Sequence, residues 1–250
     1  DGGAGPDRLD GGDGSDTASY ETSADGVTID LTLTAQDGGD AEGDTYVDIE
    51  AVSGSGFDDT IKGDRHFNIL EGGDGNDRLV TQDIGANLDA NGFHLHDENN
   101  HQIVVGGIDI LDGGTGFDKY EINSNIYTAI RMIGLGASTL DRWNVPTNTI
   151  IMDSDGIGSI KWNGQPLTQI GQTLDISDHG YFGTVTSRMV GNDLYIDLPH
   201  MWDLSSTSEI GTIEDFYDGW WHQSDIPAQF AGMAIGTIVI RNYKDGDLFY

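Results

Sequence analysis

The chain contains no cysteine among its 250 residues. Disulfides and the common zinc sites built from thiolates are therefore excluded, and stability has to come from packing or from bound ions. Basic residues are also scarce, since 11 Lys and Arg stand against 43 Asp and Glu and give a formal net charge of -32. Nucleic acids and anionic lipids are bound through clusters of Lys and Arg, so the composition argues against both classes of partner.

Long hydrophobic runs are missing as well. The best candidate, residues 231–240, is followed by Arg241 and falls short of the roughly 20 apolar residues that span a bilayer, so we expect no membrane-spanning segment. No signal-peptide pattern opens the chain, and because Asp1 would be the ninth residue of a repeat that begins upstream, we expect a fragment of a longer array. The motifs HExxH, GxSxG, the P-loop and a helix-opening GxGxxG are absent, so we expect any catalytic domain to lie upstream.

What the chain has instead is a nine-residue repeat of the form GGxGxDxUx, where U is apolar. It occurs as GGAGPDRLD at 2–10, GGDGSDTAS at 11–19 and GGDGNDRLV at 72–80, with looser units from Gly54, Gly63, Val104 and Gly113. The sixth position is acidic in nearly every unit and the eighth is apolar. One carboxylate and one apolar residue per turn predict a parallel β-roll that binds calcium.

The residue types explain the chemistry. Glycines permit the positive φ angles that direct carbonyl oxygens into a tight turn. Calcium takes about six to eight oxygen ligands at roughly 2.3–2.6 Å, which two facing turns can supply from carbonyls and sixth-position carboxylates. A charge of -32 also opposes compaction until cations neutralise part of it, so we expect calcium to drive folding.

These units resemble the RTX, or haemolysin-type, calcium-binding repeats of Gram-negative bacteria. The resemblance covers residues 2–19, 54–80 and 104–121. It implies a secreted, extracellular protein exported by a type I secretion machinery, in which the repeats serve a large toxin, adhesin or secreted hydrolase.

Candidate calcium ligands come from the turns of these units and from a later DxDG segment. They are Asp7, Asp16, Gly54, Gly56, Asp59, Asn68, Gly72, Asp74, Asp77, Asp109, Gly113, Thr115, Asp118, Asp153 and Asp155.

Register alone pairs Asp59 with Asp77. If the coil is continuous across its insertions, Asp7 faces Asp59, Asp16 faces Asn68 and Asp77 faces Asp118. Several units depart from the motif, through Ser55 and Phe57, through His66 and Asn68, or through the valines at 104 and 105, and we expect weaker sites there.

Two excursions interrupt the repeats, at residues 20–53 and 81–103. The first contains an alternating run at 27–34 and a strand-like segment at 45–53, which we interpret as a degenerate turn with Glu50 in the ligand position and Val52 in the core. The second is polar and predicts a surface loop. Its His94, His96, Asp97 and His101 could bind zinc or copper, or could be solvated side chains of a loop.

From Ile122 the repeats stop, and residues 122–250 predict a β-rich domain that caps the roll. Strands are expected at 128–133, 148–152, 158–162, 183–190, 193–198, 211–219 and 236–247, with a possible short helix at 225–232. Segments 150–167 and 237–248 are similar to regions that follow RTX repeats in type I secreted proteins. Asp153 and Asp155 then belong either to a further calcium loop or to a plain hairpin turn.

An alternative function is a ligand-binding module of the adhesin type. Aromatic residues of the C-terminal part, above all Trp220 and Trp221, could stack on a glycan of a host surface, or could fill the core of the domain. The prediction as a whole is an all-β chain. Residues 1–121 form an interrupted parallel β-roll that binds several calcium ions, and residues 122–250 form its β-rich cap.

Overall fold

The computed structural model describes residues 1–64, 66–81, 108–123, 126–133, 137–144, 148–175, 182–198, 237–244 and 248. Within these ranges the regular structure consists of β-strands and one short 3-10 helix, η1 (Gly39–Ala41), and contains no α-helix. The all-β prediction is therefore confirmed. The same residues include no helix that is long and apolar enough to cross a membrane.

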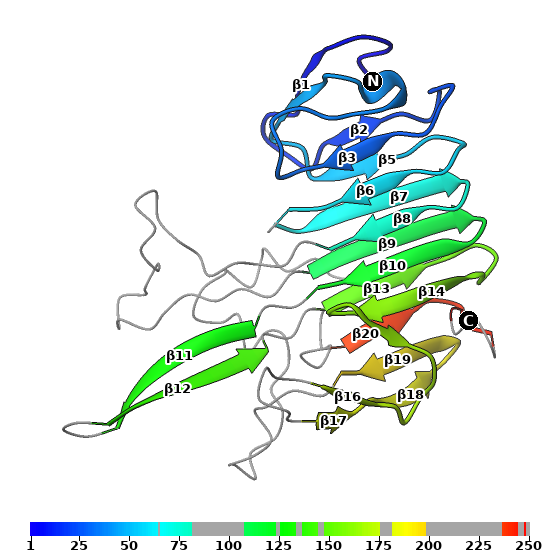
Figure 1. Cartoon of the computed structure of the whole chain (residues 1–250). Helices are drawn as coiled ribbons and strands as arrows, with labels where there is room; N and C mark the ends of the chain where they lie inside the picture. The colour runs from blue at the N-terminus through cyan, green and yellow to red at the C-terminus, as the bar shows by residue number, and fades with distance from the viewer. Residues whose placement is uncertain are drawn as a thin grey trace.

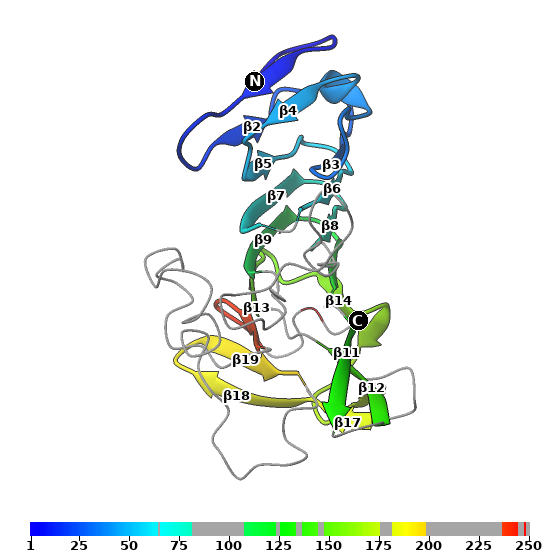
Figure 2. The same ribbon diagram turned by 90° about the vertical axis from the view of Figure 1, so that its left-hand side faces the viewer.

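Most strands belong to two sheets that face each other along the length of the molecule (Figures 1 and 2). Sheet 1 consists of the parallel strands β3 (Thr28–Asp30), β6 (Thr60–Lys62), β8 (Arg78–Val80), β10 (Asp118–Ile122) and β14 (Gly158–Trp162), with β15 (Gln165–Leu167) antiparallel at its edge. Sheet 2 consists of the parallel strands β2 (Thr17–Ser19), β5 (Ala51–Ser53), β7 (Asn68–Asp74), β9 (Ile108–Thr115), β13 (Asn148–Met152) and β20 (Thr237–Ile240), followed by the antiparallel β19 (Asp193–Asp197) and β18 (Thr186–Val190).

Three further pairs lie outside these sheets. They are the parallel pair β1 (Arg8–Asp10) and β4 (Thr45–Val47), the hairpin β11 (Ile126–Ile133) and β12 (Ala137–Asn144), and the hairpin β16 (Thr173–Asp175) and β17 (Phe182–Thr184).

The chain winds by alternating between the two sheets. From β5 to β10 each strand lies in the sheet opposite to the one before it and pairs in parallel with the strand two steps away. From β5 to β14 the eighth residue of each repeat points inward and is fully buried, while its neighbours at the seventh and ninth positions point to the other face of the sheet, as the two-residue period of a strand requires. Leu9, the eighth residue of the first repeat, is only partly buried. The core column comprises Val52, Ile61, Leu70, Leu79, Leu111, Tyr120, Ile151 and Ile160. A parallel β-roll is therefore the architecture of this part of the chain.

Both sheets continue past residue 121, where the sequence predicts the boundary of the roll. β13 pairs in parallel with β9, and β14 pairs in parallel with β10, so residues 148–162 form one more coil. The core positions Ile151 and Ile160 keep the nine-residue spacing, whereas the glycine and aspartate signature of the turn between them is degraded. That loss hides the coil from a search based on turn residues.

The first excursion is also part of the winding. β3 pairs with β6, and β5 lies between β2 and β7 with Val52 fully buried. The degenerate turn at residues 45–53 is thus confirmed, although the alternating run at 27–34 forms a strand only over Thr28–Asp30. Residues 82–103 of the second excursion and the segment at 211–219 lie outside the described residues, as does the possible helix at 225–232.

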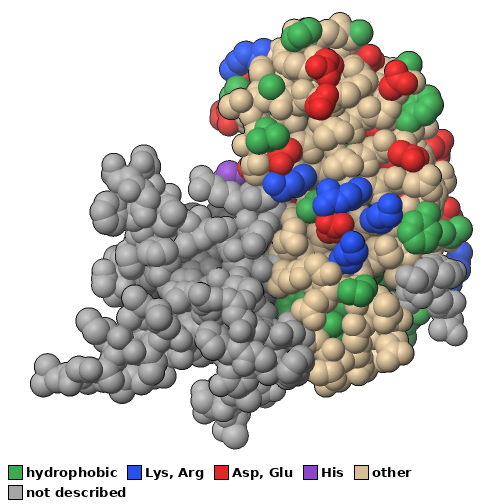
Figure 3. All heavy atoms as spheres, viewed as in Figure 1, with side chains coloured by type: hydrophobic (Ala, Val, Ile, Leu, Met, Phe, Trp, Pro, Cys, Tyr) green, Lys and Arg blue, Asp and Glu red, His purple; other side chains and the backbone are tan. Residues whose placement is uncertain are grey.

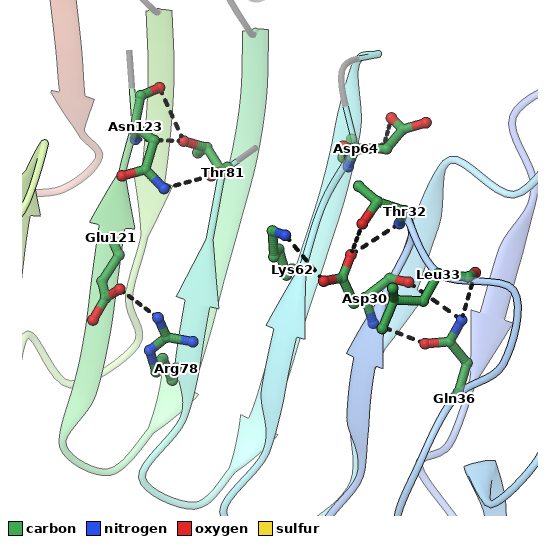
Figure 4. A network of polar contacts seen from close by, with 11 residues as sticks. Asp30, Thr32, Leu33, Gln36, Lys62, Asp64, Arg78, Thr81, Glu121 and Asn123 are labelled. Carbon is green, nitrogen blue, oxygen red and sulfur yellow. Dashed lines mark hydrogen bonds and ion pairs between the residues drawn. The ribbon is translucent and has the colours of Figure 1, made fainter. Parts of the chain in front are cut away.

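The outer face of sheet 1 gathers Lys and Arg side chains that the sequence scatters (Figure 3). Lys62 bonds Asp30 of the neighbouring strand at 3.0 Å, and Glu121 accepts from Arg78 at 2.5 Å (Figure 4). Lys161 lies 3.6 Å from the other oxygen of Glu121. Each basic side chain of this charge ladder is therefore matched by an acid on an adjacent strand.

Candidate metal centre in the stacked turns

The turns that lead from sheet 2 into sheet 1 stack along one edge of the roll, which we call the first edge. They are the turns 54–59, 72–77, 113–118 and 153–158. Register holds within the turns themselves, because Gly73 pairs with Gly114 and Asp74 with Thr115. Equivalent positions of successive repeats therefore lie directly beside one another.

Glycine is required at two positions of the central turns. Gly73 and Gly75 have φ angles of 108° and 143°, and Gly114 and Gly116 have φ angles of 84° and 133°. A Cβ on Gly114 would lie 1.9 Å from the carbonyl oxygen of Gly73. The backbones of adjacent turns thus lie too close together for a side chain at this position.

Sixth-position aspartates form a ladder inside this edge. The Asp59 N–H donates to Asp77 Oδ1 at 2.8 Å, and the Asp77 N–H donates to Asp118 Oδ1 at 2.9 Å. Asp77 and Asp118 are completely buried, and among the described residues neither of their Oδ2 atoms has a hydrogen-bond partner. The predicted pairs Asp59–Asp77 and Asp77–Asp118 are therefore neighbours in space, and each leaves one buried carboxylate oxygen unsatisfied.

Electrostatics make these oxygens costly without a cation. Burial raises the pKa of Asp77 to about 6 and that of Asp118 to about 7, and neighbouring carboxylates reinforce both shifts. A buried carboxylate is stable as an anion only when it is paired or coordinates a metal. Without a cation, the negative charges of Asp77 and Asp118 at the first edge are therefore uncompensated.

The residues fit calcium as the missing cation. The first-position glycines leave a cradle, because a Cβ on Gly72 would lie 2.3 Å from Asp77 Oδ2, and one on Gly54 would lie 2.4 Å from both Asp59 Oδ2 and the Gly72 carbonyl oxygen. Carboxylate and carbonyl oxygens are the ligands that this hard cation prefers. Within the described ranges no three His, Cys, Asp or Glu side chains converge on one point. A cation here would thus draw much of its coordination from the backbone.

Other predicted ligands of the first edge contribute less through their side chains. Asp74 and Thr115 are exposed and their side chains bond each other at 2.6 Å across adjacent turns. Gly113 is buried beneath Asp118, whereas Gly56 is exposed.

The opposite edge carries a second row of polar residues. Asp16 N–H donates to Glu50 Oε2 at 3.1 Å, Asn68 Nδ2 donates to the Glu50 carbonyl at 3.4 Å, and Asn68 N–H donates to Asp109 Oδ1 at 3.0 Å. Asp16 Oδ2 is buried without a partner among the described residues. Burial raises the pKa of Asp109 to about 8. The opposite edge therefore also carries buried carboxylate oxygens, from Asp16 and Asp109.

Two predicted pairings are wrong. Asp16 faces Glu50 and not Asn68, because β5 is inserted between β2 and β7. Asp7 does not face Asp59, because its N–H donates to Asp44 Oδ1 at 2.8 Å while Val27 N–H takes the place beside Asp59. In both cases the first excursion supplies an additional coil between the predicted partners. The coil of Glu50 is the predicted degenerate turn, whereas the coil of Val27 and β3 is not revealed by the spacing.

The DxDG segment forms the turn 153–158. Asp153 Oδ1 accepts from the N–H groups of Asp155 and Gly156, and Asp155 Oδ1 accepts from Ile157 N–H. These are the local side-chain to backbone bonds of an ordinary turn, so they favour a plain turn over a calcium loop. The turn is not the predicted hairpin, because β13 and β14 lie in different sheets and do not pair.

Two side chains at the first edge were missed by sequence reasoning. Ser55 bonds both oxygens of Asp59, and the Tyr120 hydroxyl donates to Asp153 Oδ2 at 2.7 Å. Ser55 stands where the repeat has glycine, and Tyr120 stands where other units have an aliphatic residue, so each departure from the motif was itself the available signal.

The remaining predicted binding residues lie outside the described residues. These are Trp220 and Trp221 together with the histidines at 94, 96 and 101. Trp162 is buried in the core, as the packing alternative for the aromatic residues expects.

Comparison with known families agrees with this geometry. Residues 1–25 and 53–82 match the family model of the RTX calcium-binding nonapeptide repeat (4 copies), which covers the turns 54–59 and 72–77. No curated protein gives a significant match to the chain. Such repeats indicate calcium binding and are typical of secreted extracellular bacterial proteins. The matched segments of this chain are an RTX, haemolysin-type, calcium-binding repeat region.

Proposed function

We propose that the chain is a calcium-dependent folding module of a large secreted RTX protein. The observation that carries the proposal is the pair of fully buried carboxylates, Asp77 and Asp118, each with an unpartnered oxygen inside the stacked turns. Folding without a cation has to bury these charges uncompensated, whereas a bound calcium ion converts the same oxygens into ligands. The free energy of binding then becomes free energy of folding.

The same physics suits a type I secretion machinery. Where calcium is scarce, a chain with a net charge of -32 repels itself and stays loose enough to pass a channel. Outside the cell, calcium near millimolar concentration fills even sites with dissociation constants of about 10⁻⁴ to 10⁻³ M. The asymmetry in calcium would thereby drive folding on the outer side only.

The strands after residue 162 support a capping role for the C-terminal part. β15 adds an antiparallel strand beyond β14, and β19 and β18 add two beyond β20. Leu248 is buried against Gly158 at the end of sheet 1. We propose that these elements close the last coil and that catalysis, if the parent protein has any, belongs to a different part of it.

A calcium titration of the chelated chain tests the proposal. We expect far-ultraviolet circular dichroism to change from a largely unfolded to a β-rich spectrum as calcium is added, with a cooperative midpoint. Magnesium at equal concentration should be far less effective, since it demands smaller and more regular coordination. A native-like spectrum in excess chelator, unchanged by calcium, would refute the function.

A further inference from the structure

The turns of the first edge fall into two classes. In the turns 72–77 and 113–118, the second and fourth residues are glycines with positive φ, and the sixth-position aspartate keeps a buried, unpartnered Oδ2. In the flanking turns 54–59 and 153–158, the carboxylates are bonded by protein donors. Hydrogen bonding thus separates both flanking turns from the central ones, and backbone conformation does so at the second position, since Gly156 at the fourth position of 153–158 also has a positive φ of 75°.

We propose that Ser55 and Tyr120 take the place of calcium in the two flanking turns and confine the ions of this edge to the sites of Asp77 and Asp118. The inference rests on the proposed calcium-dependent function and specifies where in the row the ions bind.

Ser55 satisfies Asp59 on the N-terminal side. Its N–H donates to Asp59 Oδ2 at 2.6 Å and its hydroxyl donates to Oδ1 at 2.9 Å, while Val27 N–H donates to Oδ1 at 2.6 Å. Neither Ser55 nor Phe57 has a positive φ, so this turn lacks the backbone conformation of the central turns. Three protein donors therefore supply the positive charge density that a cation supplies to Asp77.

Tyr120 has the corresponding role on the C-terminal side. The eighth residue of the other sheet 1 repeats is Ile or Leu, and only at this position does a hydroxyl reach out of the core column. The hydroxyl accepts from Gly113 N–H at 3.0 Å and donates to Asp153 Oδ2 at 2.7 Å. Both oxygens of Asp153 are then bonded by the protein.

The turn 153–158 also cannot supply the usual ligand. Its sixth residue is Gly158, where a Cβ would lie 2.4 Å from the Asp118 carbonyl oxygen, so the close packing of the two turns excludes a side chain. Its carboxylate comes instead from the first position, as Asp153, and points to Tyr120. The row of ions consequently ends at Asp118.

The number of bound calcium ions tests the proposal. Restoring glycine at the second and fourth positions with the double substitution Ser55→Gly/Phe57→Gly removes the hydroxyl donor of Asp59. It also permits the positive φ angles of the central turns, in which the second-position N–H leaves Oδ2 of the aspartate unpartnered. We expect one additional calcium ion per chain, counted by native mass spectrometry and by equilibrium dialysis against calcium. The matched control is Ser154→Gly, which makes the same change at the second position of a turn without a sixth-position carboxylate, and it should leave the count unchanged.

Tyr120→Phe tests the other end. Because Asp153 loses its donor, we expect the chelated protein to become less stable while the calcium count stays that of the unsubstituted chain. Loss of one ion in this variant would overturn the proposal, since Tyr120 would then be a ligand. An unchanged count in Ser55→Gly/Phe57→Gly, or its failure to fold in saturating calcium, would overturn it as well. If the unsubstituted chain itself bound no calcium, the proposed function would fail first, and the two failures are thereby distinguished.

Discussion

Replacing Asp77 by Asn should have opposite effects on stability with and without calcium. The substitution preserves the shape of the side chain and an acceptor for the Asp59 N–H, which lies 2.8 Å from Oδ1. It exchanges the buried, unpartnered Oδ2 for an uncharged amide group. A burial cost is removed in the metal-free fold, and a charged ligand is removed from the calcium-loaded fold.

The two magnitudes follow from the site. In the metal-free fold the pKa of Asp77 is raised from 3.8 to about 6, so keeping the group ionised at neutral pH or above costs up to about 3 kcal/mol, which Asp77→Asn recovers. In the loaded fold, loss of an interaction with a charged group costs about 1.5–3 kcal/mol. That loss raises the calcium midpoint roughly tenfold to a hundredfold.

Two titrations measure these effects. Calcium added to chelated protein at pH 7.5, followed by circular dichroism, gives the midpoint of folding. Chelated protein titrated with an excluded osmolyte such as sucrose gives the stability of the metal-free fold, because such osmolytes strengthen burial without occupying the ion site. We expect Asp77→Asn to need more calcium but less osmolyte than the unsubstituted chain.

Asp58→Asn is the matched control. It removes one charge from the adjacent turn 54–59, but Asp58 is exposed and its Oδ1 accepts from the backbone and side chain of Asn76. Its calcium midpoint should change little. The reasoning is refuted if Asp77→Asn and Asp58→Asn shift the calcium midpoint equally, or if Asp77→Asn destabilises the metal-free fold.

Three further predictions concern pH, turn geometry and the core. Because the folded pKa values of Asp77 and Asp118 are raised, the metal-free fold binds more protons than the unfolded chain between about pH 4 and 7. The stability of the metal-free fold should therefore rise as pH falls through this window. Osmolyte titrations in chelator at several pH values measure this dependence, and a fall in stability would contradict the prediction. Gly116→Ala should prevent the coil from stacking, because Gly116 has a φ of 133° and a new Cβ there would lie 1.5 Å from the Gly75 carbonyl oxygen. If the variant kept the full calcium-induced circular dichroism spectrum, the turns would not be packed this closely. Leu79→Ala removes a fully buried core residue and should cost about 2–5 kcal/mol in urea unfolding at saturating calcium, whereas a loss below about 1 kcal/mol would argue against the core column.

The sequence predicted the central turns well because their geometry tolerates few residue types. These turns require positive φ angles at Gly73 and Gly75 together with a carboxylate at Asp77. The residue types alone therefore determine the register of the central turns. The nine-residue spacing of the core likewise follows from the pattern of apolar residues.

The misplaced pairings have a different cause. The segment at 45–53 predicts the coil that contains β5, but nothing in the spacing shows that β3 also joins the winding. Both coils lie between the units whose aspartates were paired. Partner choice for Asp7 and Asp16 was therefore decided by tertiary structure. The coil at residues 148–162 was hidden for a related reason, since its carboxylate moved from the sixth position to the first, as Asp153.

The charge ladder on sheet 1 bears on a hazard that all repetitive folds share. Coils with the same turn and the same aliphatic core could pair with the wrong neighbour, because neither feature distinguishes one repeat from the next. The ninth-position side chains of sheet 1 do differ from coil to coil. Lys62 lies opposite Asp30, Glu121 lies opposite Lys161, and the coil between Lys62 and Glu121 carries Val80. In the native order Val80 lies between Lys62 and Glu121, and both of these residues have an oppositely charged partner on their other side. A winding that skipped one coil would keep only the pair of Lys62 with Glu121 and would set Asp30 and Lys161 against Val80, so these surface pairs favour the native order over that alternative.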